Sequence, residues 1–249
     1  MPLANLIRLE SAGSTNEYAS HLLQNSAAAE FTVIWALGQY SGRGTGGSSW
    51  ESEPGKNLTF SMVLYPYFLD VSNQFILTRF IALGVHDYIS SQLPNETVTI
   101  KWPNDIYIGN RKVAGILTEN SIMDGKFRHS VIGIGININQ LIFPSEITNP
   151  VSLKGITGNS YNLEDSLKNV CSAIISRYQQ LSRNPSEISA DEYISKLYRF
   201  NVFAKYRFRN RVISARITGI DEVGWLQLEV SDGEKISCDL KEIVFLHEV

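Results

Sequence analysis

Hydrophobic and polar residues alternate along the 249-residue chain in patterns that predict its main elements. Apolar runs rich in β-branched and aromatic residues predict strands at 31–39 and 57–66. From 72 to 93, apolar residues recur at the spacing of a helix with a broad buried face. A strand–turn–strand pattern follows, in which the Gly109-Asn110 pair is the turn signal.

The second half of the chain changes character after about residue 160. Before it, 130–139 alternates apolar residues with glycine and asparagine, which predicts a strand whose backbone a ligand approaches closely. The segment 162–182 has helical periodicity, and Ser189 with Glu192 has the spacing of a capping box at another helix start. From about residue 203 only short strands and turns are predicted. The order indicates a larger α+β unit followed by a small β-barrel.

Composition narrows the class of protein without identifying it. Hydrophobic residues make up 43% and charged residues 19%, as in an ordinary globular protein with a sizeable core. A net charge of -3 and a pI near 5.8 do not suggest a nucleic-acid partner, which usually needs a basic surface. Cys171 and Cys238 are far apart, the start carries no secretory signal, and no apolar run approaches the ~20 residues that span a bilayer. We therefore expect a soluble, cytoplasmic protein without a membrane partner.

A glycine-rich stretch, GRGTGGSSW at 42–50, follows directly after a predicted strand. Glycines let a backbone wrap closely around a ligand, and successive N–H groups can form an anion-binding nest. The stretch is not a P-loop, because no Gly-Lys-Ser/Thr follows, and not a Rossmann fingerprint, because the next element is a strand. A flexible hairpin loop explains the same composition.

Three polar residues, Ser14, Thr15 and Asn16, stand at a predicted helix N-terminus. Free backbone N–H groups at such a position favour a polar or anionic ligand. Ser14 and Glu17 also fit a capping box, which would make the same residues a structural helix start.

The stretch KWPND, 101–105, places Lys101 and Asp105 on either side of a proline turn between two strands. Such a turn fixes a carboxylate and a cation in place, as a substrate-handling site requires. Asp105 can equally satisfy the turn's own backbone. In RKVAGILTE, 111–119, Lys112 begins the next strand, where a lone lysine is usually solvated. Lys112 gains a chemical role only if it faces the glycine loop and the proline turn.

Taken in order, these stretches resemble the biotin–protein ligases over about residues 5–249. The resemblance rests on Ser-Thr-Asn, GQYSGRGTGGSSW, KWPNDIYIGNRKVAGILTE, VIGIGININ and the terminal strands. It implies an α+β fold: a mixed β-sheet with packed helices, like that of class II aminoacyl-tRNA synthetases and biotin–lipoate ligases, and a small C-terminal SH3-like β-barrel. The catalytic domain is expected at 1–200 and the barrel at 201–249. We expect a short form, without the N-terminal DNA-binding domain of some members.

The reaction implied by the resemblance has two steps. Biotin's carboxylate attacks the α-phosphate of Mg-ATP, which releases pyrophosphate and forms biotinyl-5'-AMP. A lysine of a biotin carboxyl carrier protein or domain then attacks the carbonyl, and AMP leaves. ATP and Mg²⁺ are the implied cofactors and biotin the substrate, although no carboxylate cluster assigns the Mg²⁺ ligands. The enzyme is expected to work as a monomer or a homodimer.

The resemblance also assigns roles to residues. Lys112 and Arg43 are the cations that neutralise charge where two anions meet, and Asp105 assists the incoming lysine or the metal. The residues that it implies for binding biotin and nucleotide are Ser14, Thr15, Asn16, Gln39, Gly42, Arg43, Gly44, Thr45, Trp50, Lys112, Gly115, Gly133 and Asn137.

The glycine loop departs from the family pattern at two positions. Thr45 and Ser48 stand where further arginines are common, so one loop arginine is left. Because a charge-assisted hydrogen bond is worth roughly 1.5–3 kcal/mol, we expect this chain to retain biotinyl-5'-AMP less firmly than an arginine-rich relative. The terminal stretch DLKEI lacks the glycine that usually precedes its glutamate, which leaves a ligand contact by Glu242 open.

Two other functions are compatible with parts of the pattern. A lipoate–protein ligase or octanoyltransferase shares the fold, but the arginine-bearing loop followed by KWPND and the terminal strands favours biotin. A non-catalytic biotin or adenylate sensor would tolerate loss of Lys112 and Asp105, and both residues are present.

Overall fold

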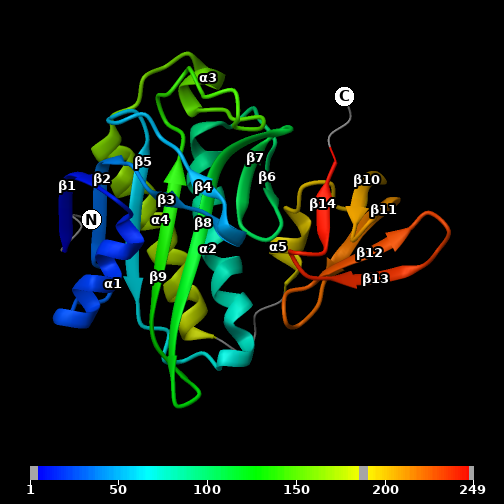
Figure 1. The fold of residues 1–249 in the computed structure, drawn as a ribbon, viewed down its shortest axis with the longest axis horizontal. Coiled ribbons are helices and arrows are strands. Elements are labelled where there is room, and N and C mark those ends of the chain that lie inside the picture. Colours follow the sequence, from blue (N-terminus) through cyan, green and yellow to red (C-terminus); the bar gives the residue numbers. More distant parts are fainter. Residues whose placement is uncertain (1–4, 185–189, 247–249) are drawn as a thin grey trace.

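A seven-stranded mixed sheet and a five-stranded antiparallel sheet organise the chain (Figure 1). The computed structural model describes residues 5–184 and 190–246. In spatial order the larger sheet consists of β1 (Leu6–Ala12), β2 (Val33–Gln39), β5 (Leu58–Leu64), β9 (Lys126–Ile136), β8 (Arg111–Met123), β7 (Asp105–Ile108) and β6 (Val98–Lys101). β1 and β2 are parallel, and every other neighbouring pair is antiparallel.

The two faces of this sheet have different covers, because successive side chains of a strand point to opposite faces. Ile34 packs with Ala19 of helix α1 (Thr15–Asn25) on one face. Its neighbours Val33 and Trp35 belong to the main core on the other face, which α2 (Gln74–Gln92) and α4 (Leu163–Arg183) cover. Figure 1 shows α1 in front of the sheet and the longer helices behind it.

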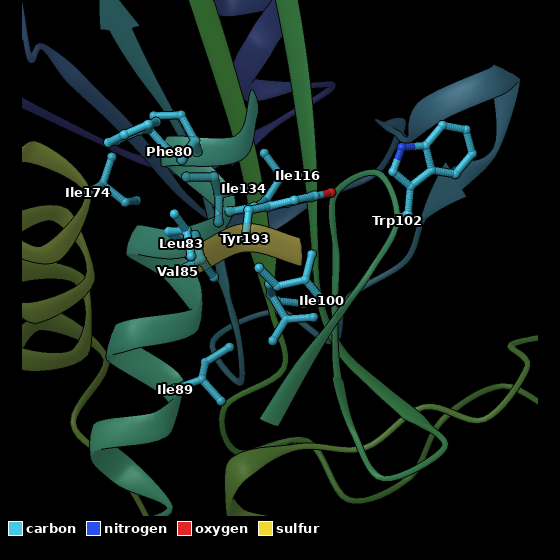
Figure 2. Packing of buried hydrophobic residues seen from close by; sticks show 14 of the residues in the cluster. Phe80, Leu83, Val85, Ile89, Ile100, Trp102, Ile116, Ile134, Ile174 and Tyr193 are labelled. Atoms are coloured by element: carbon cyan, nitrogen blue, oxygen red, sulfur yellow. The ribbon is translucent and has the colours of Figure 1, made fainter. Parts of the chain in front are cut away.

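Helices α2 and α4 are in close contact at Gly84. A Cβ atom at this position would lie 2.7 Å from the Cα of Ile174 on α4. Figure 2 shows the Ile174 side chain directed toward α2, close to Phe80. The missing side chain of Gly84 thus sets how tightly the two helices pack beneath the sheet.

The second sheet follows two short helices, α3 (Leu153–Thr157) and α5 (Asp191–Ser195). Its strands are β10 (Ala204–Phe208), β11 (Arg211–Ile220), β12 (Leu226–Val230), β13 (Lys235–Cys238) and β14 (Ile243–Phe245), in the order β13-β12-β11-β10-β14. In the part of the chain that the structure describes, no pairing joins β13 to β14, so this sheet is not a closed barrel, but it forms the small C-terminal β domain that the sequence predicts. The rest of the predicted fold class is confirmed.

The C-terminal sheet lies beside the β6–β7 edge of the larger sheet (Figure 1). The indole N–H of Trp102 donates to the carbonyl of Gly224 at 2.9 Å, and the Tyr193 hydroxyl donates to the carbonyl of Pro103 at 2.6 Å. Figure 2 shows Trp102 at a distance from the core residues that line the helices. The proline turn between β6 and β7 is therefore fixed by groups from the C-terminal half.

Most elements agree with the hydrophobic pattern. The expected helix at 72–93 is α2, the Gly109-Asn110 turn joins β7 to β8, and Gly109 has the positive φ of 56° that such a turn requires. β1 was not predicted. Ser189, the expected cap before α5, lies outside the described residues.

Across 5–184 and 190–246, no helix has the length and apolar character needed to cross a membrane.

Replacing Gly84 with alanine is expected to lower the free energy of unfolding by about 1–2 kcal/mol. Alanine favours a helix by about 1 kcal/mol over glycine, but the added methyl would collide with the backbone of α4. Chemical denaturation measures the difference, with Gln92→Ala at the exposed end of α2 as the control. A more stable Gly84→Ala protein would contradict the close helix contact.

Candidate functional site

A cavity of about 290 Å³ opens on the face of the larger sheet that α1 covers. Its floor consists of Gly133 and Gly135 of β9 and Gly115 of β8, where Gly115 and Gly135 stand directly opposite each other. Residues at alternate positions of a strand share one face, so Gly133 and Gly135 leave adjacent gaps in the same surface. Space remains over the floor because these positions carry no side chain.

Side chains from elsewhere lie directly on this glycine floor. A Cβ at Gly133 would overlap the Asn16 side-chain oxygen, and a Cβ at Gly135 would overlap the Trp50 ring. At Gly115 it would come within 3.2 Å of Lys112 Nζ and of Trp50 Cζ3. Any larger residue at Gly133 or Gly135 would displace a group that lines the cavity.

The N-terminus of α1 forms one end of the cavity. Ser14 is the N-cap residue and is buried, but its side chain makes no capping hydrogen bond, so the expected capping box is wrong. Instead, the backbone N–H of Thr15 donates to Gln39 Oε1 at 2.9 Å. Ser14 therefore lines the cavity, and its side chain makes no capping bond to the helix.

A chain of polar side chains continues from α1 across the sheet. The Ser61 hydroxyl of β5, fully buried, hydrogen-bonds the Thr15 hydroxyl at 2.7 Å and Asn16 Oδ1 at 2.6 Å. The Asn16 amide donates to Glu119 Oε2 at 2.7 Å, and Glu119 Oε1 lies 3.4 Å from Arg43 Nη2. The network fixes the orientation of the Asn16 amide above the floor, which is what discrimination between polar ligand groups needs.

The other end of the cavity carries opposite charges. Lys112 Nζ lies 2.7 Å from Asp105 Oδ1, and both side chains are partly exposed to the cavity. Between β7 and β8 the register shifts by one residue, because Val113 has no partner opposite it. Such a bulge re-aims a side chain, and it turns Lys112 to the face on which Asp105 stands. Lys112 thus lines the cavity together with the glycine loop and the proline turn, which is the arrangement that a chemical role of this lysine requires.

Lys101 lies next to this ion pair, because it stands directly opposite Asp105 in the β6–β7 pair. Burial lowers the pKa of the Lys101 ammonium; the nearby cations Lys112 and Arg199 lower it further, and Asp105 acts in the opposite direction. Burial also raises the pKa of Tyr107, whose hydroxyl lies 3.2 Å from Lys101 Nζ.

The glycine loop is a hairpin that folds over the cavity. β3 (Gly42–Arg43) pairs with β4 (Ser49–Trp50), and a 3₁₀ turn at Thr45–Gly47 connects them. The Thr45 hydroxyl accepts a hydrogen bond from the Asn104 amide at 3.0 Å, which ties the loop to the proline turn. The hairpin and ligand-contact interpretations of this sequence are thus compatible.

Most of the residues predicted from the sequence meet at this cavity. Those that line it are Ser14, Thr15, Asn16, Gln39, Arg43, Gly44, Thr45, Trp50, Asp105, Lys112, Gly115 and Gly133. Gly42 lines a neighbouring cavity instead. Asn137 is buried outside the lining, where its amide donates to the Val151 carbonyl at 3.1 Å. Glu242 pairs with Arg209 at 2.7 Å and does not line the cavity either.

Other residues at the site were not assigned a role from the sequence. Ser61 belongs to a strand with no local motif, and Glu119 ends the RKVAGILTE stretch; both hydrogen-bond Asn16, which lines the cavity. Lys101 and Asn104 were visible within the KWPND stretch. Four apolar residues of the C-terminal part also line the cavity: Leu240, Ile243, Val244 and Phe245.

Comparisons with known proteins agree with this geometry. Residues 9–137 match the biotin/lipoate A/B protein ligase family. The bifunctional ligase/repressor BirA of Bacillus spizizenii is 31% identical over 229 residues, which are 89% of this chain and 69% of that protein. The biotin–[acetyl-CoA-carboxylase] ligase of Paracoccus denitrificans is 31% identical over 62% of this chain and 65% of its own. A structure of the Aquifex aeolicus biotin protein ligase in complex with biotin and ATP is 26% identical to this chain and superimposes on it with a TM-score of 0.80. The match covers 98% of this chain and 100% of the Aquifex aeolicus chain.

Removing the Ser61 hydroxyl is expected to destabilise the fold, because Asn16 Oδ1 then loses its buried donor. Ser61→Ala should lower the free energy of unfolding by about 1–3 kcal/mol, measured by chemical denaturation. Ser182→Ala is the matched control, since its exposed hydroxyl donates only to its own helix, to the Gln179 carbonyl. Equal effects of the two substitutions would contradict a structural role for the polar network.

Proposed function

This chain belongs to the biotin/lipoate A/B protein ligase family and is a biotin–protein ligase; from that premise we propose that it activates biotin with ATP and transfers it to a lysine of a biotin carboxyl carrier domain. The observation that carries the proposal is the Lys112–Asp105 ion pair, 2.7 Å long, at the end of a cavity with a glycine floor. One cation and one carboxylate are thereby presented to the same bound molecule.

Biotin fits the end of the cavity next to α1. Its ureido ring carries N–H donors and a carbonyl acceptor, which Ser14, Thr15, Asn16 and Gln39 can match with hydroxyl and amide groups. Its apolar ring would lie over the glycine floor, beside the Asn16 amide and the Trp50 ring that rest on Gly133 and Gly135. In this orientation the valeryl carboxylate points across the floor toward Lys112.

The first step joins two anions and needs cations. A carboxylate oxygen of biotin attacks the α-phosphorus of ATP, and the bond from that phosphorus to the bridging oxygen breaks as pyrophosphate leaves. Lys112 and Arg43 both line the cavity and are positioned to neutralise charge on the carboxylate and the phosphate. Preorganised charges of this kind usually supply the largest part of the rate enhancement.

The second step needs an amine and exclusion of water. The acceptor lysine attacks the carbonyl carbon of biotinyl-5'-AMP, and AMP leaves with the electrons of the anhydride bond. Asp105 can accept a hydrogen bond from the incoming amine and orient it, since Lys112 engages only one of the two carboxylate oxygens at close range. The hairpin over the cavity covers the adenylate until the acceptor arrives.

Mg²⁺ is a partner of ATP rather than a resident of this chain. Among residues 5–184 and 190–246, no group of three or more histidine, cysteine, aspartate or glutamate side chains could hold a metal ion. Asp105, the carboxylate that lines the cavity, is already paired with Lys112. The donor set does not fit a protein-held Mg²⁺, so the ion belongs with the nucleotide as part of the substrate.

We also propose the domain division that the sequence suggests. Residues 1–200 would form the catalytic domain and 201–249 the C-terminal domain, which fits the boundary between the two main sheets. The cavity is lined from both parts, because Ile243, Val244 and Phe245 of β14 contribute to it. A cytoplasmic location stays a prediction from the sequence.

The proposal is tested by incubating the chain with Mg-ATP, an apo carrier domain and either biotin or lipoate, followed by mass spectrometry of the carrier. We expect a biotin-sized addition on one lysine. A lipoyl addition would assign the chain to the lipoate branch of the family. Binding of biotin without any pyrophosphate release would favour the sensor function instead.

Replacing Lys112 with alanine is expected to reduce biotin-dependent pyrophosphate release by roughly 10²–10³-fold, because a cation at the reacting centre is lost. Lys168→Ala is the control, since Lys168 pairs with Glu164 on the surface of α4. Activity in the Lys112→Ala protein equal to that of the control would contradict the proposed role.

Replacing Thr45 with arginine is expected to slow the release of biotinyl-5'-AMP by roughly tenfold or more, because the loop gains a charge-assisted contact to the phosphate. The Thr45 side chain instead accepts a neutral hydrogen bond from Asn104. The dissociation rate of labelled adenylate measures the effect, with Thr218→Arg on the exposed face of β11 as a charge-matched control. An unchanged rate would refute the predicted leak.

A further inference from the structure

Lys101 lines the cavity, but neither step of the reaction described above uses this cation. Its neighbour across the strand pair, Asp105, is bound to Lys112 at 2.7 Å. In the described part of the chain, Lys101 forms no close ion pair of its own. The Lys101 charge is therefore not cancelled by a carboxylate, although burial of the side chain makes that charge costly.

Two aromatic rings lie near this ammonium group, which also donates a hydrogen bond to the Tyr107 hydroxyl at 3.2 Å. Lys101 Nζ lies 5.2 Å from the centre of the Tyr107 ring and 5.1 Å from the centre of the Phe245 ring. The negative face of an aromatic ring attracts a cation without carrying a net charge. Two rings thus stabilise the ammonium while leaving its full positive charge available to a ligand.

Phe245 comes from the C-terminal sheet, far from Lys101 in the sequence. Its ring stacks on Tyr198 at 6.4 Å and meets Tyr206 edge-on at 5.1 Å between centroids. β14 pairs with β10 on one side, and Arg199 donates to the carbonyl of the residue after Phe245, Leu246, at 2.9 Å. The ring is therefore fixed by its own sheet and lines the cavity together with Lys101.

The position of Lys101 indicates which part of the ligand it meets. The glycine floor starts beside α1 on β9 and continues on β8, and the charged residues follow on β7 and β6. Neighbouring strands are about 4.8 Å apart, so Lys101 on β6 lies roughly 14 Å across the sheet from Gly133 on β9. With biotin next to α1, Lys101 lies at the end of the cavity that is left for the phosphates.

We propose that Phe245 is a positioning residue for the adenylation step: together with Tyr107, its ring keeps the Lys101 ammonium unpaired and directed at the phosphates of ATP. This inference rests on the proposed function. It makes the last strand of the C-terminal sheet part of the nucleotide end of the site. Phe245 acts through Lys101 and itself touches no reacting atom.

The test replaces Phe245 with mono-, di- and trifluorinated phenylalanine, which keep the shape of the ring and progressively remove its negative face. We expect kcat/KM for ATP in biotin-dependent pyrophosphate release to fall stepwise with each fluorine, by roughly tenfold in total. The KM for biotin and the thermal midpoint should stay constant. In a Lys101→Ala background, fluorination should have no further effect.

Phe208 provides the matched control. The guanidinium carbon of Arg209 lies 4.9 Å from the centre of the Phe208 ring in the same sheet, and Phe208 does not line the cavity. Fluorination of Phe208 should leave all kinetic constants unchanged. An active wild-type protein whose kcat/KM is insensitive to fluorination at Phe245 would overturn the inference and leave the ligase function standing. A wild-type protein that releases no biotin-dependent pyrophosphate would overturn the proposed function, and the inference with it.

Discussion

The absence of side chains at Gly115, Gly133 and Gly135 is the constraint on which the site depends. These residues share one face of two adjacent strands, and because they carry no side chains of their own, the cavity and the groups that line it can approach the strand backbone. The same gaps let Asn16 and Trp50 lie directly on the backbone of β9. A ligand on this floor is in contact with strand backbone below, with α1 at one end and with charged side chains at the other.

The charges are divided along the cavity in a way that suits a reaction between two anions. At the α1 end, the hydroxyl and amide groups of Ser61 and Asn16 belong to a hydrogen-bond network that ends at the Glu119–Arg43 ion pair. At the other end, Lys112 forms an ion pair with Asp105, whereas Lys101 forms no close ion pair and lies near the rings of Tyr107 and Phe245. The Lys112–Asp105 pair and the unpaired Lys101 can therefore serve different tasks: the pair can orient the acceptor amine, and Lys101 can bind phosphate.

The sequence predicts the parts of this arrangement that are local. The Gly109-Asn110 turn, helix α2 and the hairpin that carries the glycine loop can all be recognised from short stretches. The direction of Lys112 cannot, because it depends on a bulge at Val113 that has no sequence signature. Ser14 shows a second limit: its spacing to Glu17 fits a capping box, but in the structure its side chain makes no capping hydrogen bond. Phe245 reaches the cavity only through the packing of one sheet on another, so no local pattern could indicate it.

The measurement that tests the account most directly is calorimetric titration of biotin into the wild-type protein and into Gly133→Ala. A methyl group at this position would overlap the Asn16 side chain and occupy the floor. We predict that the wild-type protein binds biotin and that Gly133→Ala does not, with unchanged circular dichroism. Gly219→Ala, a glycine-to-alanine change on β11 where an added Cβ would meet only Ile194 Cδ1 at an ordinary 4.0 Å, should bind as the wild type does. Equal affinity in all three proteins would show that biotin does not lie on the glycine floor.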